Sequence, residues 1–285
     1  MSELKIVECP RDAMQGMHDF VPTAMKIDYI NHLLTCGFDT IDFGSFVSPK
    51  AIPQMRDTAE VLKGLNLNTS SKLLAIVANE RGANDAASFD EIQYLGYPFS
   101  ISEQFQQRNT NTSIEDSLHQ VEKLQSIVQQ SKKELVVYLS MGFGNPYGEE
   151  WNPELVLSWS ERLHKDFGVS ILALSDTIGC ADPTDVRNLF PILQSALPKV
   201  EFGAHFHTVR EKAAAVIESA YEGGCRRFDT AIKGFGGCPM AKDELTGNLA
   251  TEQLTAWMTE RDIETGLDMD AFQKAFLSSS TIFNS

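Results

Sequence analysis

The sequence is poor in basic residues, and it has neither a long apolar run nor a leader-like start. Its 285 residues include 24 Lys and Arg against 39 Asp and Glu, a formal net charge of −15. This excess of negative charge argues against a nucleic acid or an anionic membrane surface as a partner, because phosphate groups would be repelled. No stretch reaches the roughly 18 apolar residues of a membrane span. The opening MSELKIVECP lacks the basic-then-apolar order of a signal peptide.

Cysteine is scarce and follows no pattern. Five cysteines are scattered along the chain: Cys9, Cys36, Cys180, Cys225 and Cys238. Their odd number and wide spacing argue against a disulfide framework, and the lack of a C-x-x-C pair argues against a structural zinc site. With the exception of Cys238, they are interpreted as small packing residues. This cysteine usage predicts a cytoplasmic protein.

Apolar runs predict eight strands that alternate with helices. The strands are expected near Leu4–Val7, Thr40–Phe43, Leu73–Val77, Ile92–Leu95, Leu135–Ser140, Ile171–Leu174, Val200–Ala204 and Arg227–Ala231. At this chain length, the pattern favours a (β/α)8 TIM barrel formed by residues 1–285 as a single domain, with C-terminal helices from about residue 251. An open, doubly wound sheet is the alternative, but no G-x-G-x-x-G follows the first strand.

Two histidines lie at the end of the predicted seventh strand. His205 and His207 are two residues apart, so their side chains point to the same face. For an isolated pair, two ordinary histidines in a polar corner are the alternative to a metal site. The carboxyl ends of barrel strands meet at one rim, which would bring Asp12 and Asn248 to the histidines. Such mixed nitrogen and oxygen donors suit Mg²⁺ or Mn²⁺ and could accept Zn²⁺ or Co²⁺.

Further polar residues follow other strands at the same rim. Arg11 could bind an oxyanion of a substrate, and Gln15 lies close behind it. The alternative for Arg11 is a buried salt bridge to Asp42 or Asp176. These two carboxylates could act as general bases or support metal ligands, and the alternative for each is the capping of a strand end. Cys238 follows the segment GFGG, and is either an acid on a flexible loop or an inert residue in a tight turn.

Several stretches of the chain carry a family resemblance. They are KIVECPRDAMQ, IDFGSFVSPKAIPQM, LSDTIG, AHFHT, GFGGCPMA and TGNLATE. In these segments the chain resembles the 3-hydroxy-3-methylglutaryl-CoA lyases of the DRE-TIM metallolyase superfamily. The resemblance implies that the metal ligands are Asp12, His205, His207 and Asn248. It further implies that Arg11 stabilises an enolate oxygen, that Cys238 is the acid of a mobile loop, and that Asp176 supports the site.

The resemblance also implies a reaction. It is the cleavage of 3-hydroxy-3-methylglutaryl-CoA to acetyl-CoA and acetoacetate with Mg²⁺ or Mn²⁺, carried out by a homodimer. The chain departs from the lyases at Asp42, where they usually have glutamate, and in a first loop that is one residue shorter. A related lyase, aldolase or Claisen-type synthase acting on another acyl-CoA or 2-oxo acid is therefore the alternative. An iron oxygenase with two histidines and one carboxylate, or a metal-binding protein without turnover, would belong to other classes.

Overall fold

The computed structural model describes residues 4–237 and 246–283, and its centre is a closed barrel of parallel strands. The strands are β1 (Lys5–Glu8), β2 (Thr40–Ser45), β3 (Lys72–Ile76), β4 (Tyr94–Ser100), β5 (Glu134–Ser140), β6 (Ile171–Asp176), β7 (Glu201–Phe206) and β8 (Arg227–Thr230). Each strand pairs with the next along the chain, and β8 pairs with β1 to close the barrel. The predicted strands and the predicted barrel are confirmed, and the open sheet is wrong.

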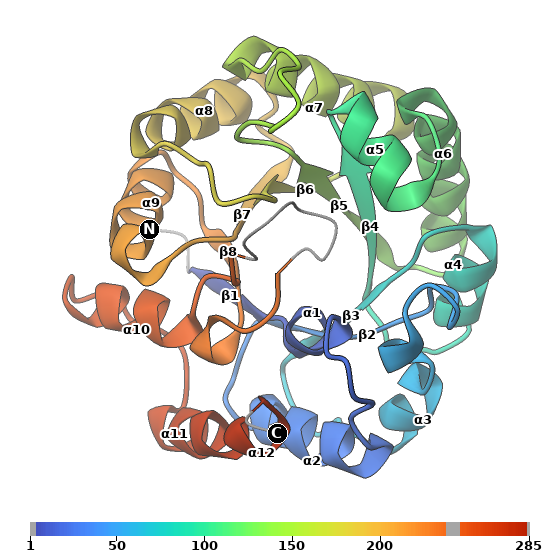
Figure 1. The fold of residues 1–285 in the computed structure, drawn as a ribbon, viewed down its shortest axis with the longest axis vertical. Coiled ribbons are helices and arrows are strands. Elements are labelled where there is room, and N and C mark those ends of the chain that lie inside the picture. The colour runs from blue at the N-terminus through green and yellow to red at the C-terminus, as the bar shows by residue number, and fades with distance from the viewer. Residues whose placement is uncertain (1–3, 238–245, 284–285) are drawn as a thin grey trace.

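Helices form a ring outside the strands (Figure 1). They are α1 (Pro10–Gln15), α2 (Thr23–Leu34), α3 (Thr58–Lys63), α4 (Glu80–Ala87), α5 (Glu103–Thr110), α6 (Ile114–Gln130), α7 (Pro153–Phe167), α8 (Pro183–Ala196), α9 (Arg210–Glu222), α10 (Thr251–Thr259), α11 (Met269–Ser278) and α12 (Ser280–Phe283). Within the described ranges, no helix is long and apolar enough to cross a membrane. Helix α1 begins with Pro10 directly after β1, which places Arg11 and Asp12 in its first turn at the carboxyl end of the strand.

Side chains inside the barrel differ between its two halves. On β3 to β6 they form an apolar cluster, here called the apolar half: Leu74, Ile76, Tyr94, Val136, Tyr138, Ile171 and Ala173. On β1, β2, β7 and β8, and at their ends, several buried side chains are polar or charged; this polar half contains Asp42, His205, Arg227 and Asp229, with the thiol of Cys9 close to His205 and Asp229. A larger apolar cluster packs between the strands and the helices. Its burial stabilises the fold by about 25 cal/mol per Å², so the barrel can carry buried charges on one side.

The chain from residue 246 returns to the barrel before α10 begins. His207 pairs with Asn248 in an antiparallel bridge, and Ala231 pairs with Ala250 in a parallel bridge. The backbone N–H of Leu249 donates to the carbonyl of Phe206 over 2.9 Å. These contacts hold Asn248 against the end of β7.

Candidate metal centre and active site

The imidazoles of His205 and His207 converge at the end of β7, with their Nε2 atoms 3.2 Å apart. The Nδ1 atom of His205 lies 3.2 Å from Oδ2 of Asp229. The Nδ1 atom of His207 lies 3.0 Å from the carbonyl oxygen of Thr246. Ionised carboxylate and carbonyl oxygens only accept hydrogen bonds, so each Nδ1 carries the proton. Both Nε2 lone pairs then face the same point, an arrangement that a cation would stabilise.

Burial and charge affect the two histidines differently. Burial opposes protonation of His205, but its contact with Asp229 and the nearby charge of Asp12 raise its pKa overall. Burial and the neighbouring His205 lower the pKa of His207 to about 4. His207 is therefore neutral at physiological pH, as a histidine ligand of a metal must be.

Asp12 faces the two histidines from the first turn of α1. A carboxylate oxygen of Asp12 and one nitrogen of each histidine lie within 4.8 Å of one another, and this group could hold a metal ion. The carboxylate accepts hydrogen bonds of 2.8 Å from Nη1 of Arg11 and from Nε2 of Gln15. Burial opposes ionisation of Asp12, but Arg11 and the histidines lower its pKa overall. Asp12 is therefore an anion, which a divalent cation requires.

Asn248 stands beside Asp12 at the same point. Its Nδ2 donates to Oδ2 of Asp12 over 2.7 Å and to the carbonyl of Phe235 over 2.8 Å. The amide oxygen is then free to bind a cation. The arrangement requires Gly236, where φ is +96° and an added Cβ would lie 2.5 Å from Nδ2 of Asn248. The structure thus brings the four predicted ligands together, and their two imidazoles, carboxylate and amide oxygen form a donor set that could hold a divalent metal ion.

Arg11 is held from two sides. Its Nε lies 3.2 Å and 3.0 Å from the two carboxylate oxygens of Asp42, and its Nη2 donates to the same group. Its Nη1 donates to Asp12 and, over 3.0 Å, to Gln15. Burial raises the pKa of Asp42 to about 6, although the neighbouring guanidinium opposes this shift. Asp42 therefore lies behind Arg11 and orients it, whereas Arg11 itself borders the cavity described below.

The carboxylate of Asp176 is not part of this group of contacts. The carboxylate of Asp176 accepts the backbone N–H groups of Cys180 over 2.8 Å and Ala181 over 3.0 Å. Asp176 therefore fixes the loop after β6, which corresponds to the strand-end capping considered as its alternative role. Cys238, the predicted loop acid, lies outside the described residues.

A cavity of about 710 Å³ opens over the site. On the side of the polar half it is bordered by Arg11, Asp12, Gln15, His205 and His207. On the opposite side it reaches Tyr97 of β4, Asn109 of α5 and Gln120 of α6. A ligand in this cavity would meet the candidate metal ligands at one end and hydrogen-bonding side chains at the other.

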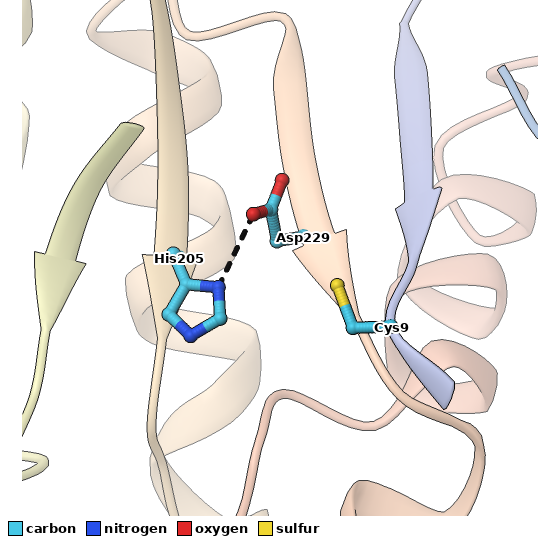
Figure 2. Close-up of side chains that lie close together, drawn as sticks. All are labelled: Cys9, His205 and Asp229. Carbon is cyan, nitrogen blue, oxygen red and sulfur yellow. Dashed lines mark hydrogen bonds and ion pairs between the residues drawn. The ribbon is translucent and has the colours of Figure 1, made fainter. Parts of the chain in front are cut away.

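Asp229 is a site residue that the sequence analysis missed. It pairs in register with His205 across β7 and β8, and its side chain is fully buried. Figure 2 shows Asp229 directed at the ring of His205, with the thiol of Cys9 nearby. Because alternate residues of a strand share a face, Asp229 could have been found from the register of β7 against β8. Of the cysteines interpreted as packing residues, Cys9, Cys36 and Cys225 are buried as predicted, whereas Cys180 is exposed, so the prediction is wrong for Cys180.

Comparisons with known proteins match nearly the whole chain. Residues 4–276 match the family model described as HMGL-like. The chain is 35% identical over 266 residues to the hydroxymethylglutaryl-CoA lyase YngG of Bacillus subtilis, covering 93% of this chain and 88% of that protein. It is 34% identical over 274 residues to a 3-hydroxy-3-isohexenylglutaryl-CoA/hydroxy-methylglutaryl-CoA lyase of Pseudomonas aeruginosa, covering 96% and 90%. An HMG-CoA lyase of Acinetobacter baumannii, solved with coenzyme A and 3-methylmalate, superposes with a TM-score of 0.90 at 32% identity, covering 98% and 90%.

Proposed function

Because the chain belongs to the HMGL-like family, we propose that it is a metal-dependent carbon–carbon lyase that cleaves 3-hydroxy-3-methylglutaryl-CoA to acetyl-CoA and acetoacetate. The observation that carries the proposal is the convergence of Asp12, His205 and His207 beside Arg11 at one cavity. The name of the Bacillus subtilis relative supports this substrate. The coenzyme A in the Acinetobacter baumannii structure supports an acyl-CoA ligand.

Asp12, His205, His207 and Asn248 would hold Mg²⁺ or Mn²⁺, which when bound supplies a Lewis acid for the substrate hydroxyl and carboxylate. Arg11 would place its positive charge where the thioester oxygen becomes an enolate. Asp42 orients this guanidinium before the substrate arrives, so little reorganisation accompanies the reaction. Gln15 contacts Arg11 and Asp12 and borders the same cavity, and we assign it to substrate binding. Cys238 would protonate the enolate carbon from its loop.

We expect a homodimer that works in the cytoplasm. The resemblance to the lyases supports the dimer. The proposal of a cytoplasmic location rests on the scattered cysteines. With a net charge of −15, we expect neither a nucleic acid nor a membrane as partner.

A second candidate substrate is a 3-hydroxy-3-alkylglutaryl-CoA with a longer group at carbon 3. The cavity favours it, because apolar side chains that could contact such a group also line it: Val47, Ala51, Ile52, Ile76 and Phe105. The Pseudomonas aeruginosa relative is named for an isohexenyl substrate of this kind.

One assay tests both candidates. Purified protein is incubated with 3-hydroxy-3-methylglutaryl-CoA or its isohexenyl homologue, with Mn²⁺ or with a chelator, and acetyl-CoA and the 3-oxo acid are measured. We expect Mn²⁺-dependent acetoacetate from the first substrate, and no product from His205→Ala. Product from the longer substrate alone would favour the second candidate. If neither thioester is cleaved by Mn²⁺-loaded protein, the lyase proposal is wrong, and release of CoA from acetyl-CoA and a 2-oxo acid would indicate a synthase.

A further inference from the structure

We propose that Asp229 is the positioning residue that fixes the tautomer of His205 and thereby directs its Nε2 to the metal. The proposal rests on the metal centre proposed above but not on the identity of the substrate. The carboxylate Oδ2 of Asp229 lies 3.2 Å from Nδ1 of His205. The two residues are paired in register on adjacent strands, and the side chain of Asp229 is fully buried (Figure 2).

The charge state of Asp229 determines the direction of this hydrogen bond. An ionised carboxylate has no proton to donate, so the imidazole must donate from Nδ1 and keep its lone pair on Nε2. A histidine that ligates a metal commonly makes such a second contact, and its loss typically weakens metal affinity by about 10- to 100-fold.

Arg227 keeps a positive charge near Asp229. It lies two residues earlier on β8, so its side chain shares the inward face, and it is 1% exposed. It packs closely across Gly203, where an added Cβ would lie 3.0 Å from its Cδ. Among the described residues, neither Nε and Nη2 of Arg227 nor Oδ1 of Asp229 has a hydrogen-bond partner. The remaining nitrogen of the guanidinium, Nη1, lies 3.4 Å from Oε1 of Glu201, and the buried atoms without a partner are of the kind that bridging water satisfies.

Cys9 offers a competing explanation for the same residues. Its sulfur, a carboxylate oxygen of Asp229 and a nitrogen of His205 lie within 4.8 Å of one another, a group that could hold a second metal ion. The Nδ1 atom of His205 already contacts Asp229, however, and a metal there would have to replace that hydrogen bond. We therefore assign Asp229 to the orientation of His205 and regard a second metal as the alternative that the experiment must test.

The experiment compares the wild-type protein with Asp229→Asn. An asparagine can donate its amide N–H to Nδ1 and so stabilise the wrong tautomer with little change of shape, the effect known for such substitutions beside other functional histidines. In metal-free protein with ¹⁵N-labelled histidine, at a pH above the raised pKa of His205, we expect His205 to be protonated at Nδ1 alone in wild type and at Nε2 alone in the variant. His207 is the internal control, because its Nδ1 faces the backbone carbonyl of Thr246 in both proteins. Calorimetry should show Mn²⁺ affinity about 10- to 100-fold weaker in Asp229→Asn.

A matched variant separates positioning from general destabilisation. Asp57 is another buried carboxylate, 2.7 Å from Lys26, and its side-chain partners among the described residues, Lys26 and Thr23, are not proposed metal ligands. We expect Asp57→Asn to lower the unfolding temperature while leaving Mn²⁺ affinity unchanged.

Protonation of wild-type His205 at Nε2, or equal Mn²⁺ affinity in Asp229→Asn and wild type, would overturn the proposal. A thiolate-to-cobalt absorption band in Co²⁺-loaded protein that disappears in Cys9→Ser would also overturn it, because it would reveal the second metal position. Each readout is measured without substrate, so an inactive lyase would leave this test intact.

Discussion

The two halves of the barrel interior bury different kinds of side chain. The apolar half, on β3 to β6, packs side chains that carry no charge. The polar half buries charged groups, and an unpaired buried charge is strongly destabilising. Its charges therefore occur in contact with one another: Arg11 with Asp42 and Asp12, and His205 with Asp229.

This difference predicts how substitutions act. A change in the polar half removes a contact that also orients a ligand or a charge at the cavity, so it should affect binding or turnover first. A change in the apolar half leaves a void but no unpaired charge. Except at Ile76 and Tyr138, which border the cavity over the site, it should therefore affect the free energy of unfolding alone. The predictions below test that separation, beginning with the largest expected effect.

Asp12→Ala should have the largest effect. It removes the only carboxylate of the proposed ligand set and one partner of Arg11, so we expect turnover to fall by at least about 10³-fold. Mn²⁺ binding by calorimetry should become undetectable, while far-ultraviolet circular dichroism stays unchanged. Normal Mn²⁺ affinity in Asp12→Ala would show that the metal binds elsewhere.

Arg11→Lys tests the fixed charge separately from the metal. Lysine keeps the charge but cannot make the two-point contact with Asp42, so its ammonium would not be held toward the cavity. We expect kcat to fall by about 10²-fold to 10³-fold while Mn²⁺ affinity stays within a few-fold. An unchanged kcat would mean that the guanidinium serves only as the salt-bridge partner of Asp42.

Cys238→Ser tests the predicted loop acid at the carboxyl end of the barrel. A serine hydroxyl is a much weaker acid than a thiol, so we expect turnover to fall by about 10²-fold or more. The Mn²⁺ affinity should match wild type, since the thiol is not among the proposed ligands. Wild-type turnover in the variant would leave Cys238 as an inert residue of its turn.

Ile171→Ala tests the apolar half. Ile171 lies on β6 and is 4% exposed, so truncation leaves a cavity that costs about 2–5 kcal/mol of unfolding free energy. Urea denaturation should show this loss, and Mn²⁺ affinity and kcat should be unchanged. A tenfold change in either would show that the two halves are coupled.

Much of the fold and of the candidate site could be predicted from the sequence. The strands were recognisable because strands of a parallel barrel are buried on both faces and therefore form short apolar runs. The carboxyl ends of barrel strands meet at one rim, and this predicted that Asp12 and Asn248 lie together although they are 236 positions apart in the chain. Neither inference requires knowledge of side-chain direction.

The rest depended on side-chain direction, which the sequence leaves open. Arg11 had two possible carboxylate partners, and only the packing of α1 against β2 shows that it contacts Asp42. The carboxylate of Asp176 turns to the backbone of its own loop, which bends at Gly179 with φ at +69°. Asp229 became recognisable only with the register of β8 against β7.

Glu8 gives the smallest and most specific test, because it shows how β1 in the polar half tolerates a buried carboxyl group that has no cationic partner among the described residues. It is fully buried on β1 and accepts hydrogen bonds from the backbone of Ile232 and the hydroxyl of Thr251. Burial raises the pKa of Glu8 to about 8, from an ordinary value of 4.5. Between these values the folded state holds a proton that the unfolded state has lost, so the contribution of Glu8 to stability decreases as pH rises. Glu8→Gln removes this dependence, and its stability relative to wild type should increase by about 1.4 kcal/mol per pH unit from about pH 5.5 to 7.5, measured by urea denaturation. A difference that stays constant over this range would mean that Glu8 is ionised in the folded protein, and that the strand tolerates a buried charge without a cationic partner.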